Sequence, residues 1–167
     1  DLDIALLKRE PGAGAALAAW PEHLHWITGP GELPTAGEPV PLVAFPQGCI
    51  YRNRAIHALE QAGRRWRIAY ESPNLTGLQA ALSGGLGVAL LERRCMAAGH
   101  RQVDEAFPAV PSSELALCVV QPAREPVRHL AETIREFCEA EMRRLAGQSL
   151  RAVEGGAVQA TATWMTG

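Results

Sequence analysis

Apolar runs alternate with amphipathic segments through the middle of the chain. Apolar or alternating residues predict strands over residues 2–7, 24–28, 42–45, 66–71, 88–91 and 115–120. A Gly/Ala/Pro-rich connection over residues 11–21 separates the first two of these strands. Helical periodicity predicts one helix over residues 49–62, which Gly63 ends, and another that begins at Asn74 as its N-cap. This alternation is typical of βαβ units that build a parallel sheet.

A long amphipathic helix is predicted near the end of the chain. It begins at Pro126, and the sequence predicts an apolar stripe along one of its faces. The stripe consists of Leu130, Ile134, Phe137 and Leu145. After Gly147 the periodicity fades, so residues 147–167 are predicted to be a weakly ordered tail.

Two segments rich in helix and strand breakers divide the chain. They cover residues 29–39 and 107–113, and they read as crossovers on either side of a continuous βαβαβ block. This pattern predicts a discontinuous first lobe interrupted by a second one. The expected domains are residues 1–30 with 113–146 for the first lobe and residues 41–112 for the second.

Composition excludes several classes of protein. The chain has 167 residues, of which 47% are hydrophobic and 20% charged, with a formal net charge of −2. These values are typical of a globular protein, and they argue against a disordered chain or a surface that coats nucleic acid. No apolar run has the length of a membrane span. The four cysteines form no C-x-x-C pair, which favours reduced thiols and a cytoplasmic location.

Catalytic and cofactor motifs give no positive signal. Gly85-Leu86-Gly87 precedes a predicted strand, whereas a dinucleotide-binding loop follows one. His23 and His25 share one face of a strand but have no third ligand nearby in sequence, so no metal site is predicted. No serine sits in a G-x-S-x-G elbow. We therefore expect no catalytic residue, no metal and no cofactor.

An ordered series of segments resembles a known family. These segments are residues 41–52 (PLVAFPQGCIYR), Ala62-Gly63, Tyr70-Glu71-Ser72 and residues 80–91 (AALSGGLGVALL). At these spacings they resemble the effector-binding domain of LysR-type transcriptional regulators over about residues 1–145. The resemblance implies an α/β, periplasmic-binding-protein-like (type 2) fold, in which two crossover strands join two Rossmann-like lobes. It also implies a small-molecule effector in the interlobe cleft.

The resemblance implies partners as well. Family members are homo-oligomers, here expected to be a homodimer or tetramer, and they bind DNA through a separate N-terminal winged-helix domain. That domain and the opening of the first lobe are absent from this sequence, so we expect a fragment with an incomplete first lobe and no membrane partner. The alternative hypothesis is a solute-binding protein of a transporter with the same fold. The four cysteines, interpreted as reduced thiols, argue against that alternative.

The expected ligand site lies on loops that follow strands. Two predicted helices start there, and their free backbone N–H groups suit an anion such as the carboxylate of a small metabolite. The resemblance places effector contacts on Gln47, Gly48, Cys49, Ser72, Pro73 and Asn74. Lys8 and Thr28 stand at the ends of the two predicted first-lobe strands, so we expect them to close the other wall. Cys49 is interpreted either as a packed or cleft-lining side chain or as a redox-active thiol.

Overall fold

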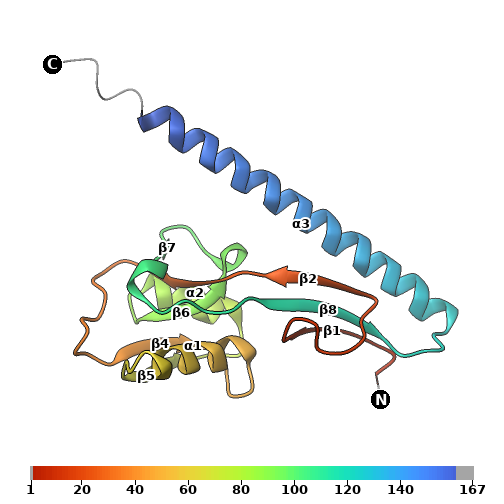
Figure 1. The fold of residues 1–167 in the computed structure, drawn as a ribbon, viewed down its shortest axis with the longest axis horizontal. Coiled ribbons are helices and arrows are strands. Elements are labelled where there is room, and N and C mark those ends of the chain that lie inside the picture. The colour runs from red at the N-terminus through yellow and green to blue at the C-terminus, as the bar shows by residue number, and fades with distance from the viewer. Residues whose placement is uncertain (1, 161–167) are drawn as a thin grey trace. The chain divides into compact units, whose positions relative to one another are not determined.

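A computed structural model describes the backbone of residues 2–160 and the side chains of residues 2–144. The elements in chain order are β1 (Ile4–Arg9), β2 (Ala18–Glu22), β3 (Leu24–Thr28), β4 (Val40–Ala44), α1 (Ile50–Gln61), β5 (Trp66–Glu71), α2 (Leu75–Ser83), β6 (Val88–Glu92), η1 (Arg93–Cys95), β7 (Arg101–Gln102), η2 (Asp104–Ala106), β8 (Ser113–Val119) and α3 (Glu125–Ala160). Figure 1 shows their course along the chain. The six predicted strands and three predicted helices all form, and apart from the end of α3 their bounds shift only slightly. β2 lies partly in the segment predicted as a connection, so that prediction was wrong there.

Contacts divide the chain into two units. Unit 1 contains residues 1–5, 16–18 and 117–167, and unit 2 contains residues 6–15 and 19–116. A three-stranded sheet has the strand order β1-β8-β2, and a five-stranded sheet has the order β5-β4-β6-β3-β7. The five-stranded sheet lies entirely in unit 2, which also holds α1 and α2 (Figure 1).

A buried apolar core holds the strands and helices of unit 2 together. β4 and β6 consist almost entirely of buried apolar residues, as expected for parallel strands covered on both faces. Leu59 of α1 and Leu78 and Leu82 of α2 are fully buried in the same cluster. Gly87 has a precise role, because a Cβ atom there would lie 2.1 Å from the carbonyl oxygen of Pro41. The glycine therefore allows β6 to enter the sheet close to the start of β4.

β3 belongs to a different sheet from the one expected. Residues 1–30 were assigned to the first lobe, but β3 pairs antiparallel with β6 over all five residues and with β7 at its far end. Four of its five residues are buried, so this strand completes the core of the sheet in the 41–112 segment. Its short apolar pattern does not encode which sheet it joins, because either partner buries the same side chains.

α3 differs from its prediction in two respects. The helix continues through Gly147 to Ala160, a range predicted to be a weakly ordered tail. Residues 161–167 of that predicted tail lie outside the described residues. Among the described side chains of α3, Ala131 and Cys138 are buried, whereas Leu130 and Phe137 of the predicted stripe are 47% and 67% exposed. Leu145, the last residue of the predicted stripe, lies outside the described side chains. The buried stripe is therefore shifted by one residue from the expected one.

Candidate functional site

Several chain segments meet at one edge of the five-stranded sheet. β4 runs parallel to both β5 and β6, so the loops that follow these three strands leave the sheet on the same side. β3 is antiparallel to β6, with Leu24 opposite Glu92, so the amino end of β3 reaches the same side. We call this side the carboxyl edge. Ligands of open α/β sheets bind outside such edges.

The loop after β4 leads into α1 through Gln47, Gly48 and Cys49. Gly48 has a φ of 90°, a conformation that favours glycine and turns the chain into the helix. Gln47 and Gly48 are exposed, and Cys49 is half-buried at the N-cap position. The side chain of Cys49 makes no capping hydrogen bond. The first N–H groups of α1 are therefore not satisfied by a cap, as a site for an anion requires.

The loop after β5 leads into α2 through Ser72, Pro73 and Asn74. Ser72 is buried, and its hydroxyl accepts from the backbone N–H of Asn74 at 3.2 Å. Asn74 occupies the predicted N-cap position, but its side chain makes no capping hydrogen bond. Pro73 and Asn74 are exposed at the carboxyl edge. Ser72 thus shapes the turn, and the amide of Asn74 is not held by the helix.

Arg52 connects the ends of β4 and β5. Its Nη1 donates to the carbonyl oxygen of Phe45 at 3.0 Å and also pairs with the carboxylate of Glu71. Phe45 directly follows β4, and Glu71 is the last residue of β5. The two predicted ligand-binding loops are therefore held beside each other by one side chain.

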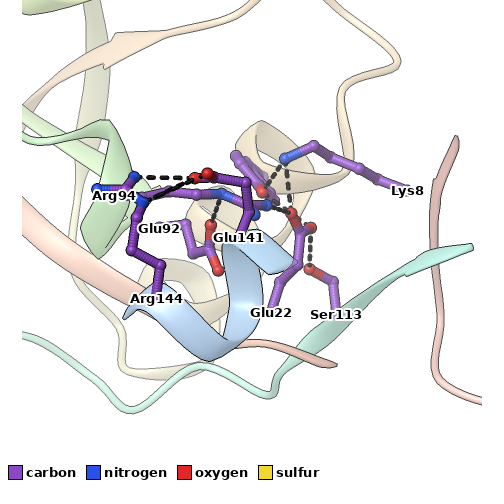
Figure 2. Close-up of polar contacts among 8 residues, drawn as sticks. Lys8, Glu22, Glu92, Arg94, Ser113, Glu141 and Arg144 are labelled. Carbon is purple, nitrogen blue, oxygen red and sulfur yellow. Dashed lines mark hydrogen bonds and ion pairs between the residues drawn. The ribbon is translucent and has the colours of Figure 1, made fainter. Parts of the chain in front are cut away.

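A buried carboxylate organises the other half of the carboxyl edge. Glu22, which ends β2, is 0% exposed. Its Oε1 lies 3.0 Å from Lys8 Nζ and 2.6 Å from Arg94 Nη2, and its Oε2 accepts from the Ser113 hydroxyl at 3.3 Å (Figure 2). A buried carboxylate is tolerated only when paired and hydrogen-bonded in this way. We call Lys8, Glu22, Tyr51, Glu92, Arg94 and Ser113 the Glu22 cluster.

Tyr51 links this cluster to the first turn of α1. Its hydroxyl donates to Glu22 Oε2 at 2.9 Å, and Lys8 Nζ donates to the same hydroxyl. Lys8 Nζ also lies 4.0 Å from the centroid of the Tyr51 ring, in cation–π geometry. Burial, together with the negative charge of Glu22, raises the pKa of Tyr51. The phenol therefore remains a proton donor at neutral pH.

Two groups on the loop after β6 have shifted ionisation. Burial raises the pKa of Glu92, and the nearby charge of Arg94, with which it pairs, only partly opposes this shift. Burial also raises the pKa of the Cys95 thiol. Protonation of Glu92 leaves the positive charges of Lys8 and Arg94 opposed by Glu22 alone. The cluster then carries a net positive charge.

The structure brings together most of the predicted ligand residues, but not all. Lys8 lies in the Glu22 cluster, and residues 47–49 and 72–74 lie on neighbouring loops of the carboxyl edge. Thr28 is at the opposite edge, because β3 is antiparallel and Thr28 is opposite Val88, the first residue of β6. Thr28 is buried, and its hydroxyl donates to the carbonyl of Gly87 at 2.9 Å. Thr28 was expected on a strand of the first lobe, whereas β3 pairs with β6 and β7.

Sequence reasoning missed the centre of the site. Glu22 and Arg94 were not singled out, and they are 72 positions apart in the chain. Tyr51 lies within the segment that carried the family resemblance, which was its only signal. Glu22 ends a strand that the sequence pattern did not reveal, so nothing local marked it as buried.

The described residues contain neither a cluster of metal ligands nor a membrane-spanning helix. Within them, no group of three or more His, Cys, Asp and Glu side chains is arranged to hold a metal ion. No helix in the same part of the chain is long and apolar enough to cross a bilayer.

Comparison with known proteins identifies the family. The profile of the LysR substrate binding domain matches residues 1–143. The chain belongs to this family.

Curated and solved relatives agree with the family assignment. The chain is 33% identical over 98 residues to the HTH-type transcriptional regulator DgdR of Burkholderia cepacia, covering 58% of the chain and 33% of that protein. The chain therefore matches about a third of the length of this relative. It is also similar in fold to the regulatory domain of HypT from Salmonella typhimurium in its bromide ion-bound form. That TM-score is 0.60 at 14% identity, over 83% of the chain and 73% of that domain.

A third relative is the regulatory domain of CcmR from Synechocystis PCC6803, solved in complex with 2-PG. The TM-score is 0.54 at 15% identity, over 78% of the chain and 71% of that domain. These likenesses confirm the periplasmic-binding-protein-like α/β fold of a LysR regulatory domain. The family match and the curated relative DgdR, an HTH-type transcriptional regulator, do not favour the transporter hypothesis.

Proposed function

We propose that this LysR-family chain senses a small carboxylate-bearing metabolite at the carboxyl edge. Binding there controls DNA binding by a separate winged helix-turn-helix domain. The observation that carries the proposal is the pair of cations on Glu22. The Lys8 and Arg94 side chains are 36% and 27% exposed, so the buried carboxylate holds both in place while each still reaches solvent.

The loops on the same edge complete the proposed site. Gln47, Gly48 and Cys49 bring the uncapped start of α1, and Ser72, Pro73 and Asn74 bring that of α2. Backbone N–H groups at a helix start, together with the positive end of the helix dipole, bind carboxylates well. In our proposal the ligand carboxylate accepts hydrogen bonds from these N–H groups. The positively charged ammonium group of Lys8 attracts the same carboxylate. Thr28 has no part in this site.

Relatives with bound ligands support a small, polar effector. HypT has been solved with a bromide ion and CcmR with 2-PG, each in its regulatory domain. We propose that this chain senses its ligand without transforming it and that it works in the cytoplasm. We further propose that it acts as a homodimer or tetramer within a DNA-binding regulator, as its curated relative DgdR is an HTH-type regulator.

Calorimetric titration tests this function. A panel of small carboxylates, including pyruvate, succinate and phenylacetate, is titrated into the chain. The best binder is then titrated into a variant that combines Gln47→Ala with Asn74→Ala. We expect affinity to fall by about tenfold, the effect of losing one or two hydrogen bonds to a charged ligand.

A matched control separates a local effect from a general one. Arg67→Ala combined with Glu105→Ala removes two exposed polar side chains of opposite charge that lie outside residues 47–49 and 72–74. We expect this control to bind the carboxylate as tightly as the unaltered chain. Equal affinity of the Gln47/Asn74 variant, or a panel without any saturable heat, contradicts the proposed site.

A further inference from the structure

A groove runs along α1, beside the segment that follows η2. Its volume is about 880 Å³, within the usual range for small-molecule sites. Ile50, Arg54 and Ala58 recur every four residues of α1 and line its length, and the segment 108–111 contributes Pro108, Ala109 and Pro111. Asn53, His57 and Gln61, spaced in the same way, are exposed at its margin. The groove thus combines an apolar lining with a polar rim.

Arg54 is the charged group within this groove. The residue is more than nine-tenths buried, and its Nη1 donates to the carbonyl oxygen of Pro111 at 2.5 Å. Its Nη2 donates to Glu10 Oε2 at 2.5 Å, and its buried Nε has no hydrogen-bond partner. A buried guanidinium requires a carboxylate or an equivalent acceptor. Glu10 provides this, but its own side chain is 66% exposed.

The pairing of Arg54 with Glu10 is therefore unequal. The cation is held by burial and by Pro111, whereas the carboxylate sits at the mouth of the groove with most of its surface in water. An ion pair with an exposed partner contributes little to the free energy of folding. Another carboxylate can replace Glu10 while Arg54 remains neutralised, and Glu10 then regains full hydration. Glu10 thus marks the position that the carboxylate of a ligand would take.

We propose that this groove is a second ligand site, for an amphipathic monocarboxylate. The carboxylate replaces Glu10 at Nη2 of Arg54, and the hydrocarbon part covers Ile50, Ala58 and the 108–111 segment. The donors at the rim, Asn53 and Gln61, hydrogen-bond any polar substituent of the ligand. A bound molecule contacts both α1 and the 108–111 segment, so it strengthens the packing between them.

This site is separate from the one under Proposed function. Gly48 borders the groove, but no member of the Glu22 cluster lines it, and neither Gln47 nor Asn74 does. Tyr51 belongs to the Glu22 cluster and does not line the groove, whereas Arg54 lines the groove and pairs with Glu10 and the carbonyl oxygen of Pro111. The two proposals can therefore fail independently.

Octanoate is a suitable probe, because it pairs one carboxylate with a short hydrocarbon chain. It is titrated into the isotope-labelled chain while backbone amide chemical shifts are followed by NMR, with octanol as the uncharged control. We expect saturable shifts at Asn53, His57 and Ala109, and weaker binding of octanol. Shifts confined to residues 47–49 and 72–74, equal binding of octanol, or no saturable shift overturn the proposal.

Two variants test the exchange of carboxylates. Glu10→Gln removes the internal competitor, so octanoate should bind about threefold more tightly, the scale of a partly exposed ion pair. Looser or unchanged binding contradicts the exchange. Ala109→Trp changes an exposed residue and fills the groove without touching Arg54, so it should abolish the shifts at Asn53 and His57 while the fold persists. Retained binding in this folded variant contradicts the location.

Discussion

Glu22 and Arg94 meet through an ion pair of 2.6 Å at the carboxyl edge, although 72 positions separate them in the chain. Glu22 ends β2, and Arg94 lies in η1 directly after β6. The pair joins the amino end of β3 to the loop after β6. It also sets Lys8 and Tyr51 in position around one fully buried carboxylate.

Removal of that carboxylate should destabilise unit 2. Glu22→Gln leaves Lys8 and Arg94 without their shared counter-ion, and we expect a loss of about 2 kcal/mol in the free energy of unfolding. The loss is smaller than for a fully buried pair, since both cations reach solvent. Urea unfolding measures it. The control, Glu132→Gln, removes an exposed intrahelical pair with Arg135 and should leave stability almost unchanged, because solvent screens that pair. Similar losses in both variants would contradict a special role for Glu22.

Glu92 should make stability dependent on pH. Its pKa is raised in the folded protein, so its contribution is fully present below the unfolded value, near 4.5, and is lost as pH rises through the folded value. Glu92→Gln cannot lose a proton, so we expect it to raise the Tm relative to the unaltered chain at pH 7.5 but hardly at pH 4.5. Thermal unfolding followed by circular dichroism across this range gives the comparison. A difference in Tm that is constant with pH contradicts the raised pKa.

Gly87 should not tolerate a side chain. In Gly87→Ala the new Cβ meets the carbonyl oxygen of Pro41, and the strands must separate to accommodate it. We expect a loss of about 2–3 kcal/mol, in the range of overpacked cores. Gly37→Ala is the matched control, because a Cβ there meets no atom within 4 Å. Chemical denaturation compares the two, and equal stability of both variants would contradict the close approach of β6 to β4.

Trp26 should anchor the segment that follows η2. Its Nε1 donates to the carbonyl oxygen of Pro108 at 2.8 Å, and its ring stacks on Phe107 with centroids 5.0 Å apart. Trp26→Phe keeps an aromatic ring but removes the donor, at an expected cost of about 1–3 kcal/mol for a carbonyl left without its partner and for the smaller ring. Trp66→Phe is the control, because Trp66 is only half-buried at the edge of the core and its Nε1 donates to Glu60 at an exposed site. Its expected cost, measured in the same urea unfolding assay, is clearly smaller than that of Trp26→Phe.

The elements of the 41–91 segment were predictable because their signals are local. α1 and α2 follow from helical periodicity, and β4 and β6 follow from continuous apolar runs. Their alternation implies a parallel sheet, so the neighbouring positions of residues 47–49 and 72–74 could be predicted as well. Lys8 was expected at the site because it stands at the end of a predicted strand, and the structure places it in the Glu22 cluster.

Only the tertiary structure decided the rest. The direction of β3 moved Thr28 away from the carboxyl edge, because an apolar strand buries the same side chains in either sheet and in either direction. The Glu22 cluster likewise depends on contacts across 14 to 91 positions, which no local pattern records. Sequence therefore determines which segments become helices and strands, since each depends on its neighbours in the chain. The partners of a buried charge depend on which segments fold together, and this is determined by the packing of the whole sheet.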